Sequence, residues 1–262
     1  MPTQLYQEYV PHPALAAYVQ CYWSIAQSAQ PLTNHVLPDG CIDVMFSVTA
    51  GACFADVVGT MLSAASVPLE PATTFLGVRF KPGGALPFLR VSAQTLTDGV
   101  LRLDDVWPSV TRDLSEQIHD APTLAAKVAR LEAELLRRVL AIPAVDVLTL
   151  NTIHYIRAAR GRVSVRELST HAALSERQLE RRFREHTGLS PKLFARLIRF
   201  RSAAMLLQQQ PQLAVQDLVF ASGFYDQAHF IHDFKAFAGV TPSEYQAQQR
   251  DVGFLQYRLR LP

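Results

Sequence analysis

The sequence predicts an α+β protein. Its N-terminal domain should be mainly β, barrel-like or sandwich-like with some helices, and its C-terminal domain should be all α with two helix-turn-helix units. Short β-rich segments separated by turn residues dominate residues 1–120, whereas apolar residues recur at helical spacing from residue 145 onward. Two segments of the C-terminal part also resemble each other. At 262 residues, with 49% hydrophobic and 18% charged residues, the chain is long enough for two globular domains.

Four segments of the N-terminal part have the composition of β-strands. They cover residues 35–40, which end in a Pro-Asp-Gly turn, and residues 41–48, 54–59 and 73–80. A turn over residues 81–84 closes the last of them. Several short strands in a small space indicate a barrel or a sandwich of two sheets. Such a fold encloses an apolar interior large enough for a small ligand.

Residues 123–140 are expected to form one amphipathic helix, because apolar side chains recur at helical spacing at Leu124, Val128, Leu131, Leu135 and Val139. The apolar face of helix 123–140 either packs on its own domain or forms a homodimer contact with the same helix of a second copy. A proline-containing break at residues 141–144 then places the boundary between a first domain, residues 1–141, and a second domain, residues 145–250. Residues 251–262 are left as a C-terminal tail.

Residues 165–194 and 215–245 are two related segments. The second copy follows the first at an offset of 50 residues in its first half and 51 in its second half, so one extra residue lies beside Gly223, where a turn can take it. A helix from Pro191 to Gln209 is expected to join the copies. Two copies of one helix-turn-helix imply two reading helices in successive major grooves, about 34 Å apart.

The helix expected to follow Ser175 has an apolar side and a basic side. Ser175 and Gln178 have the spacing of a capping box, and Leu179 and Phe183 mark the side that must be buried. The basic side then faces outward, where an arginine can pair with a guanine edge in the major groove. The base-reading candidates of the first unit are Arg177, Gln178, Glu180 and Arg181.

The second unit repeats this geometry with less charge, and its base-reading candidates are Gln227, Ala228, Ile231 and His232. His232 fits a phosphate or sugar contact better than a base contact, and a lone histidine of this kind is often structural. Contacts with DNA phosphates are expected from Arg184, Lys192, Arg196, Arg199, Arg201 and Lys235. The alternative, a solvated helix face paired with glutamates, is disfavoured because residues 177–201 hold eight basic and only two acidic residues.

Charge is divided unequally between the two halves of the chain. Residues 1–144 hold nine Lys/Arg and thirteen Asp/Glu, a balance of −4, whereas residues 145–262 hold sixteen and ten, a balance of +6. The overall charge of +2 hides this division. An asymmetry of this kind favours a polyanion, here double-stranded DNA, as the partner of the basic half.

The second unit nearly matches the pattern AxxxGFxDxxHFxxxFKxxxGxTPxxY over residues 220–245. This pattern resembles the second helix-turn-helix unit of the AraC/XylS family of bacterial transcription regulators, and the first unit resembles the family through Leu168, Arg182 and Gly188, among others. The resemblance covers residues 145–249. It implies a two-unit DNA-binding domain that regulates transcription, usually by activation through contacts with RNA polymerase. Phe220 departs from the small residues usual there, so slightly different packing is expected.

In the family, the base-reading positions fall on residues that match Arg177, Glu180 and Arg181 in the first unit and Gln227, Ala228, Ile231 and His232 in the second. The N-terminal half is also similar to a less characterised group of AraC-type regulators. The matching phrases are Tyr18-Val19, Tyr22-Trp23, Leu37 to Cys41 and Gly77 to Gly83. This second resemblance implies a regulatory or sensor domain.

Arg79, Lys81 and Arg90 could bind an anionic effector in an apolar cleft, and Trp23 is a further candidate ligand. The alternative is that the three cations lie on the surface and balance nearby acidic residues. His35, Asp39, Cys41 and Asp43 cluster around one turn, but their spacing fits a structural turn better than a metal site.

Cys21, Cys41 and Cys53 are an odd number of cysteines without a signal peptide, which indicates thiols in a cytoplasmic, nucleoid-associated protein. The absence of an apolar run of about 18 residues argues against a membrane span. We expect no catalytic site, metal or cofactor. The alternatives are a thiol-reactive, alkyl-accepting or redox-sensing domain fused to a DNA-binding module, and a purely architectural DNA binder without an effector.

Overall fold

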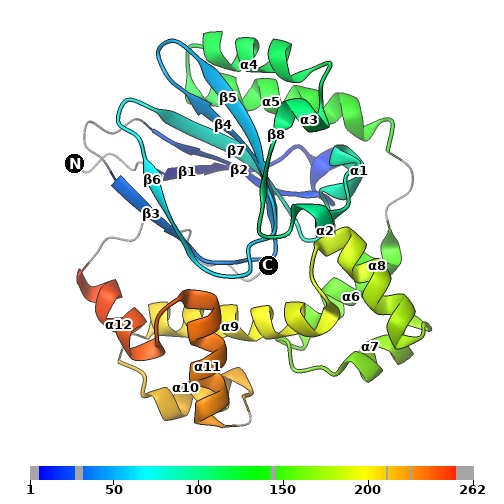
Figure 1. Ribbon diagram of the computed structural model, residues 1–262, viewed down its shortest axis with the longest axis vertical. Helices are drawn as coiled ribbons and strands as arrows, with labels where there is room; N and C mark the ends of the chain where they lie inside the picture. The colour runs from blue at the N-terminus through cyan, green and yellow to red at the C-terminus, as the bar shows by residue number, and fades with distance from the viewer. Residues whose placement is uncertain (1–5, 27–31, 143–145, 211, 225, 252–262) are drawn as a thin grey trace.

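A computed structural model describes residues 6–26, 32–142, 146–210, 212–224 and 226–251 (Figure 1). The predicted fold class is confirmed, because the N-terminal part is built around sheets and the C-terminal part is helical. The tail assigned to residues 251–262 lies outside the described residues, apart from Asp251. In the described part of the chain, every helix is too short or too polar to cross a membrane.

The N-terminal part contains eight strands among the described residues and several short helices. The strands are β1 Tyr6–Tyr9, β2 Val19–Ile25, β3 Leu32–Val36, β4 Ile42–Val48, β5 Cys53–Val58, β6 Ala65–Leu69, β7 Thr74–Phe80 and β8 Val100–Arg102. The helices are η1 Pro13–Leu15, α1 Leu86–Leu89, α2 Ala93–Leu96, α3 Leu103–Val106, α4 Thr111–Asp120 and α5 Leu124–Val139.

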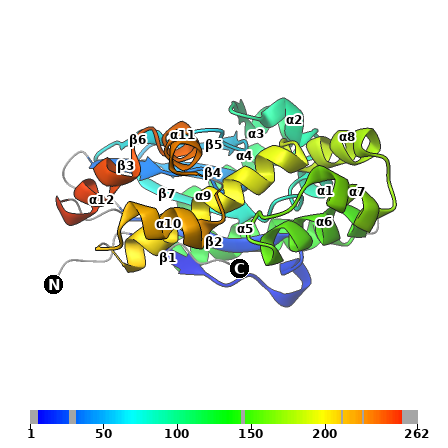
Figure 2. The ribbon, with the colours of Figure 1, turned by 90° about the horizontal axis from the view of Figure 1, so that it is seen from below.

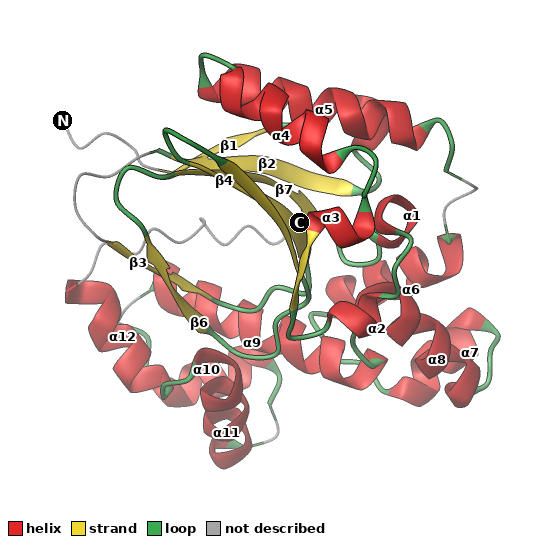
Figure 3. Ribbon diagram, turned by 45° about the horizontal axis from the view of Figure 1, so that its top comes forward, coloured by secondary structure: helices red, strands yellow, loops and turns green. Residues whose placement is uncertain are grey.

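Six of these strands form one antiparallel sheet in the order β1-β2-β7-β4-β5-β8, and β3 pairs with β6 in a second sheet. Side chains alternate across the large sheet because successive residues of a strand point to opposite faces. Tyr22, Val44 and Val78 point to the face covered by α4 and α5, where the main core lies. Trp23 and Phe75 belong to a separate cluster on the opposite face, with Leu69 of β6. Figure 3 shows β3 and β6 on the side of the large sheet away from α4 and α5.

Three of the four predicted strands are present as β4, β5 and β7, and the fourth, β3, begins and ends earlier in the chain than predicted. Residues 35–40 were expected to be strand up to the turn, but β3 ends at Val36. Pro38 has no N–H group to donate to a sheet, and the Asp39 carboxylate accepts the Cys41 N–H at 2.8 Å, which forms the turn. Strands β1, β2, β6 and β8 were not predicted from the sequence. β2 is buried almost throughout, so it shows little alternation of apolar and polar residues.

The predicted helix 123–140 is present as α5, which begins after the N-cap Thr123. Its apolar face, with Val128, Leu131 and Leu135, is buried in the core of its own domain. This face is therefore not available for the homodimer contact that was the second interpretation of helix 123–140. Leu140 is 88% exposed just after the helix.

The C-terminal part consists of seven helices among the described residues: α6 Val147–Ala158, α7 Val165–Ala172, α8 Glu176–Thr187, α9 Pro191–Gln209, α10 Val215–Ser222, α11 Gln227–Ala238 and α12 Pro242–Asp251. α7 and α8 form the first helix-turn-helix, α10 and α11 form the second, and the predicted middle helix is present as α9. Figure 2 shows α8 and α11 toward opposite ends of α9. The turn inside the second unit is one residue longer than in the first, as the change of offset predicted.

The two parts of the chain touch along one extended contact. The Thr60 hydroxyl donates to the Thr187 carbonyl at 3.0 Å, and the Thr97 hydroxyl donates to the Gly188 carbonyl at 3.0 Å. Leu37 from the N-terminal part is buried in the apolar cluster of the C-terminal helices. The turn that contains Gly40 also lies against α9. The N-terminal part is thus anchored to α9 and to the end of α8.

Replacing Gly40 with alanine should destabilise the folded protein. Gly40 has a φ of +79°, and a Cβ added there would lie 2.9 Å from Cε2 of Phe194 on α9. We expect the free energy of unfolding to fall by about 1–2 kcal/mol from backbone strain alone, measured by urea denaturation. Gly51→Ala is the matched control, because nothing lies within 4 Å of its Cβ position. An equally small change in both variants would contradict the contact between this turn and α9.

Candidate nucleic-acid interface and ligand cavity

The first helix-turn-helix is fixed by two reciprocal caps and a buried apolar face. Ser164 and Glu167 form a capping box at the start of α7, and Ser175 forms one with Gln178 at the start of α8, as predicted. Leu179 and Phe183 of α8 are buried. The ring of Phe183 lies edge-on against that of Phe194 of α9, with centroids 5.5 Å apart. These contacts set the rotation of α8 about its own axis.

That rotation leaves the predicted reading side of α8 facing outward. Arg177, Gln178 and Arg181 are exposed, and Glu180 is half-buried. Together with Arg184 and Ser175 they line a surface hollow that also includes Gln94 of α2. The arginines therefore project away from the core. Their assignment to particular bases stays a prediction.

The second unit presents a less charged face. Asp226 caps α11, and Phe230 and Phe234 are buried. Among its four reading candidates, Gln227, Ala228 and His232 are exposed, whereas Ile231 is half-buried and packs against the apolar cluster. Ile231 thus has a packing role in addition to any contact with DNA, a role that the sequence analysis did not foresee.

The six predicted phosphate contacts fall into two groups. Arg184, Lys192 and Lys235 are exposed, whereas Arg196, Arg199 and Arg201 are half-buried and contact other parts of the protein. Arg196 binds both carboxylate oxygens of Asp233, at 3.1 and 2.7 Å. The Nη1 of Arg199 donates to the Gly161 carbonyl at 3.4 Å. Arg201 lies 3.9 Å from the Asp39 carboxylate of the N-terminal part.

Asp233 is a structural residue that sequence reasoning missed. It is 1% exposed on α11, and its partner Arg196 is 37 positions earlier in the chain, so no local pattern could reveal the pair. Burial alone would raise the pKa of Asp233, but the hydrogen bonds and charge of Arg196 lower it below its ordinary value. This ion pair joins the reading helix of the second unit to α9.

Asp146 has the same function for the first unit. It caps α6 and accepts two hydrogen bonds from Arg182 of α8, at 2.9 and 2.7 Å, while His186 lies 3.0 Å away. Burial would raise the pKa of Asp146, but hydrogen bonds from Arg182 and Thr149 outweigh it and hold the pKa at about 2. Arg182 therefore positions α8 through this ion pair, although its own side chain is partly exposed.

The effector candidates separate in the structure. Trp23 and Arg79 line a cavity of about 350 Å³ between the large sheet and the β3–β6 sheet, as a sandwich fold predicts. Lys81 is not part of that lining, and its ammonium donates to the Ala16 carbonyl at 2.6 Å. The alternative that placed Arg79 on the surface is wrong, because Arg79 is 3% exposed.

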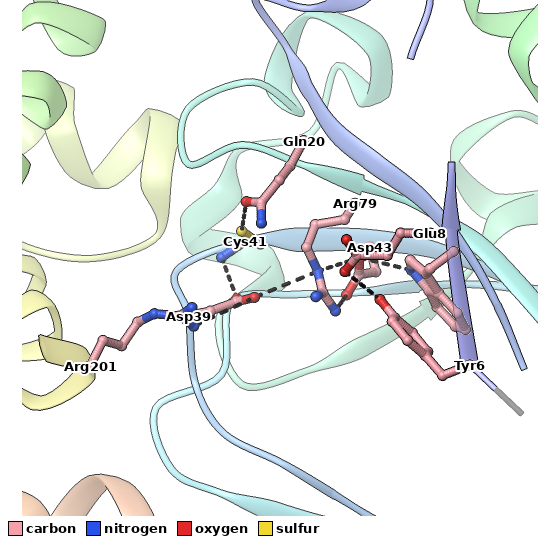
Figure 4. Close-up of polar contacts among 9 residues, drawn as sticks. Tyr6, Glu8, Gln20, Asp39, Cys41, Asp43, Arg79 and Arg201 are labelled. Carbon is pink, nitrogen blue, oxygen red and sulfur yellow. Dashed lines mark hydrogen bonds and ion pairs between the residues drawn. The ribbon is translucent and has the colours of Figure 1, made fainter. Parts of the chain in front are cut away.

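Arg79 already has carboxylate partners inside the protein. It binds Asp43 through two hydrogen bonds, at 3.1 and 3.0 Å, and lies 3.5 Å from Asp39 (Figure 4). Asp43 also accepts a hydrogen bond from the Trp23 indole at 3.3 Å. An anionic effector, as expected from sequence, would have to compete with Asp43 for this guanidinium.

The three thiols lack the environment of a reactive cysteine. Burial is the largest cause that raises the pKa of Cys21 to about 12 and that of Cys53 to about 11, and it also raises the pKa of Cys41. A reactive thiol needs a lowered pKa, because the thiolate is the nucleophile. These environments disfavour the thiol-reactive alternative. Over the described residues, no group of His, Cys, Asp and Glu side chains is arranged to hold a metal ion.

Comparison with known proteins identifies two regions of the chain. Residues 168–248 match a family described as "Helix-turn-helix domain", and residues 7–102 match a "Domain of unknown function (DUF6597)". The C-terminal region is thus a helix-turn-helix domain, the class of DNA-binding module that its geometry defines. More particularly, the match over residues 168–248 agrees with the resemblance to AraC-type regulators, and it covers both helix-turn-helix units.

Relatives of this region carry names from gene regulation. The chain is 44% identical over 71 residues to the HTH-type transcriptional regulator GlxA of Rhizobium meliloti, a match that covers 27% of this chain and 22% of that protein. It is 35% identical over 90 residues to the HTH-type transcriptional activator RhaS of Escherichia fergusonii, covering 34% and 32%. The chain thus spans less than a third of the length of these relatives.

A solved structure of a transcriptional regulator from Chromobacterium violaceum, described as an AraC-type DNA-binding domain-containing protein, is also similar. It is 26% identical, with a TM-score of 0.37, and the match covers 40% of this chain and 95% of that one.

Arg196→Ala should lower the free energy of unfolding by about 1–3 kcal/mol, because it leaves the buried Asp233 carboxylate without its main partner. Lys192→Ala on the same helix removes an exposed side chain and should change the free energy of unfolding by less than about 0.5 kcal/mol. Urea denaturation at neutral pH measures both. Equal losses in the two variants would contradict the structural role of Arg196.

The contribution of this ion pair should also depend on pH. Because the pKa of Asp233 is lowered in the folded state, its contribution is present above the ordinary carboxyl pKa of about 3.9 and is lost as pH falls through the lower folded value. The difference in stability between the unmodified protein and Arg196→Ala should therefore shrink as the pH is lowered below about 4. A difference that grows on acidification would contradict the pairing.

Proposed function

We propose that this protein is a sequence-specific, DNA-binding transcription regulator, an activator, that is controlled through its N-terminal part. One observation carries this proposal: two helix-turn-helix units are built on one helix, and each presents an exposed polar face at its second helix. α9 has 19 residues, so at about 1.5 Å per residue it is about 28 Å long. That length suits two helices in successive major grooves, about 34 Å apart.

Residues on the two units divide into reading and anchoring roles. Arg177, Gln178, Glu180 and Arg181 of the first unit and Gln227, Ala228, Ile231 and His232 of the second are the proposed base contacts. Exposed cations beside them, Arg184, Lys192 and Lys235, are the proposed phosphate contacts. Lys192 lies in the first turn of α9, where backbone N–H groups also face outward and favour an anion. We do not propose phosphate contacts for Arg196, Arg199 and Arg201, because each has a partner within the protein.

Control through the N-terminal part has a physical route. Arg79 lies in the wall of the cavity, Asp39 lies between Arg79 and Arg201, and Arg201 belongs to α9. The next residue, Gly40, packs against Phe194 of the same helix. A molecule that changes the position of Arg79 can therefore change how the Asp39 turn holds α9, to which both units are attached.

Two further partners belong to the proposal. An activator contacts RNA polymerase, and the similarity to a relative named as an activator supports that role. A homodimer would have to use a surface other than the apolar face of α5. A protein with these partners works in the cytoplasm, where the nucleoid lies.

The function is tested by selecting binding sites from a random pool of duplex DNA with the full chain. We expect one motif with two parts, and footprinting should show protection of two major-groove segments on one face of the duplex, about 10–10.5 base pairs apart. A pool that converges on no motif would refute sequence-specific binding. A motif with a single part would refute the use of both units.

Arg177→Ala and Lys192→Ala test the division between reading and anchoring. Arg177→Ala should cost about 1–3 kcal/mol on the selected site and relax the preference at one base position. Lys192→Ala should weaken binding to all sequences alike and reduce the slope of log affinity against log salt by about one. Fluorescence anisotropy with the selected duplex and single-base variants measures both effects. Equal losses on every sequence from both variants would contradict the assignment.

A further inference from the structure

The cavity between the two sheets has mainly apolar walls and a few polar lining residues. Its apolar lining includes Trp23, Met45 and Phe75 of the large sheet and Val67 and Leu69 of β6. A volume of about 350 Å³ lies in the range of small-molecule sites. Val67 and Val100 line it and are 38% and 62% exposed, so the cavity reaches the surface at this rim.

The shape of the cavity depends on a glycine. A Cβ on Gly77 would lie 2.9 Å from the Trp23 indole and 2.5 Å from the Val44 carbonyl oxygen, so the indole lies directly over the backbone of β7. A side chain at position 77 would displace this ring, whose nitrogen donates to Asp43 at 3.3 Å. The Trp23 wall of the cavity and the Asp43 carboxylate are therefore directly linked.

The polar residues of the lining offer hydrogen-bond acceptors. Asn34 is 9% exposed, lines the cavity, and has a side-chain oxygen with no hydrogen-bond partner. Such an oxygen carries a desolvation cost that a donor would remove. The ionised groups of the lining are two carboxylates, Asp43 and Asp98, and one guanidinium, Arg79, a formal balance of −1. A ligand with a positive charge and N–H donors complements this wall, whereas a carboxylate would meet Asp43 and Asp98.

We propose that this cavity binds an apolar amine, with its hydrocarbon part between Trp23, Phe75 and Met45 and its ammonium group against Asp43 and the Asn34 oxygen. An aromatic face beside a carboxylate is the arrangement that favours an organic cation. Burial raises the pKa of Asp43, and the bidentate contact with Arg79 opposes that rise, so a second cation lowers the cost of keeping this carboxylate ionised.

Binding of the amine would also affect the helices of the C-terminal part, through Arg79 and Asp39. An ammonium that shares Asp43 with Arg79 leaves the guanidinium more dependent on Asp39, and Asp39 is the carboxylate that Arg201 of α9 approaches. This step rests on the proposed function, whereas binding of the amine does not.

Three probes with one hydrocarbon frame test the ligand class: 3-phenylpropylamine, 3-phenylpropan-1-ol and 3-phenylpropionate. Isothermal titration calorimetry on the full chain without DNA should give the tightest binding for the amine, with affinity at least about tenfold above that of the carboxylate. The ratio of the affinity for the amine to the affinity for the alcohol should also fall about tenfold or more in Asp43→Asn.

Asp56→Asn is the matched control, since Asp56 on the adjacent strand β5 pairs with Arg102 and is not part of the cavity lining. It should leave all three affinities unchanged. Circular dichroism checks that Asp43→Asn stays folded. Should it unfold, Asn34→Ala is used instead, with a smaller loss expected for the amine alone. Tighter binding of the carboxylate, equal binding of amine and alcohol, or no binding of the amine at millimolar concentration would each overturn the proposal.

A second measurement separates this inference from the proposed function. Anisotropy on the selected duplex, with and without the amine, should show a change in DNA affinity that is lost in Arg201→Met, while calorimetry shows that Arg201→Met still binds the amine. Binding of the amine with no selected DNA site would sink the proposed function and leave the ligand class standing. A selected DNA site without binding of the amine would overturn the ligand class and leave the proposed function standing.

Discussion

Burial of aromatic side chains along α9 is the constraint on which the rest of the C-terminal part depends. Phe194 near one end of α9 packs on Phe183 of the first unit, and Phe200 packs on Phe234 and Phe237 of the second, with ring centroids 5.1 to 5.5 Å apart. Each ring fixes which side of its reading helix is inside. The polar side of each helix is then exposed as a consequence.

Two ion pairs further fix the orientation of the packed helices. Arg182 with Asp146 and Arg196 with Asp233 each join a reading helix to another helix of the same domain, and in both pairs the carboxylate is the less exposed partner. A carboxylate removed from water is stable only while its cation stays in place. Each pair therefore resists a rotation of α8 or α11 that the apolar contacts alone would tolerate. Basic residues of this region divide between holding the helices and presenting charge.

The local features of this fold could be predicted from the sequence, and the long-range pairs could not. Capping boxes, the start of α9 at Pro191 and the extra residue of the second unit depend on neighbours in the chain, and all are present. Strand β2 was missed because burial on both faces removes the alternation that marks a strand. Arg79 was predicted as an effector ligand, and it lines the cavity between the sheets, but its carboxylate partners were not predicted. Its partners Asp39 and Asp43 lie 40 and 36 positions earlier in the chain, and only the register of β4 and β7 brings Asp43 beside it.

The two units are unequal, and their difference has a physical consequence. α8 exposes Arg177, Arg181 and Arg184, whereas the exposed basic residue at the corresponding face of α11 is Lys235, beside neutral Gln227 and Ala228. Affinity that depends on salt arises from cations near phosphates, so the first unit should account for most of it. The second unit is held to α9 instead by Asp233, Phe234 and Phe237. On the proposed function, its uncharged side chains would add discrimination through thymine methyl groups and adenine edges rather than salt-dependent affinity.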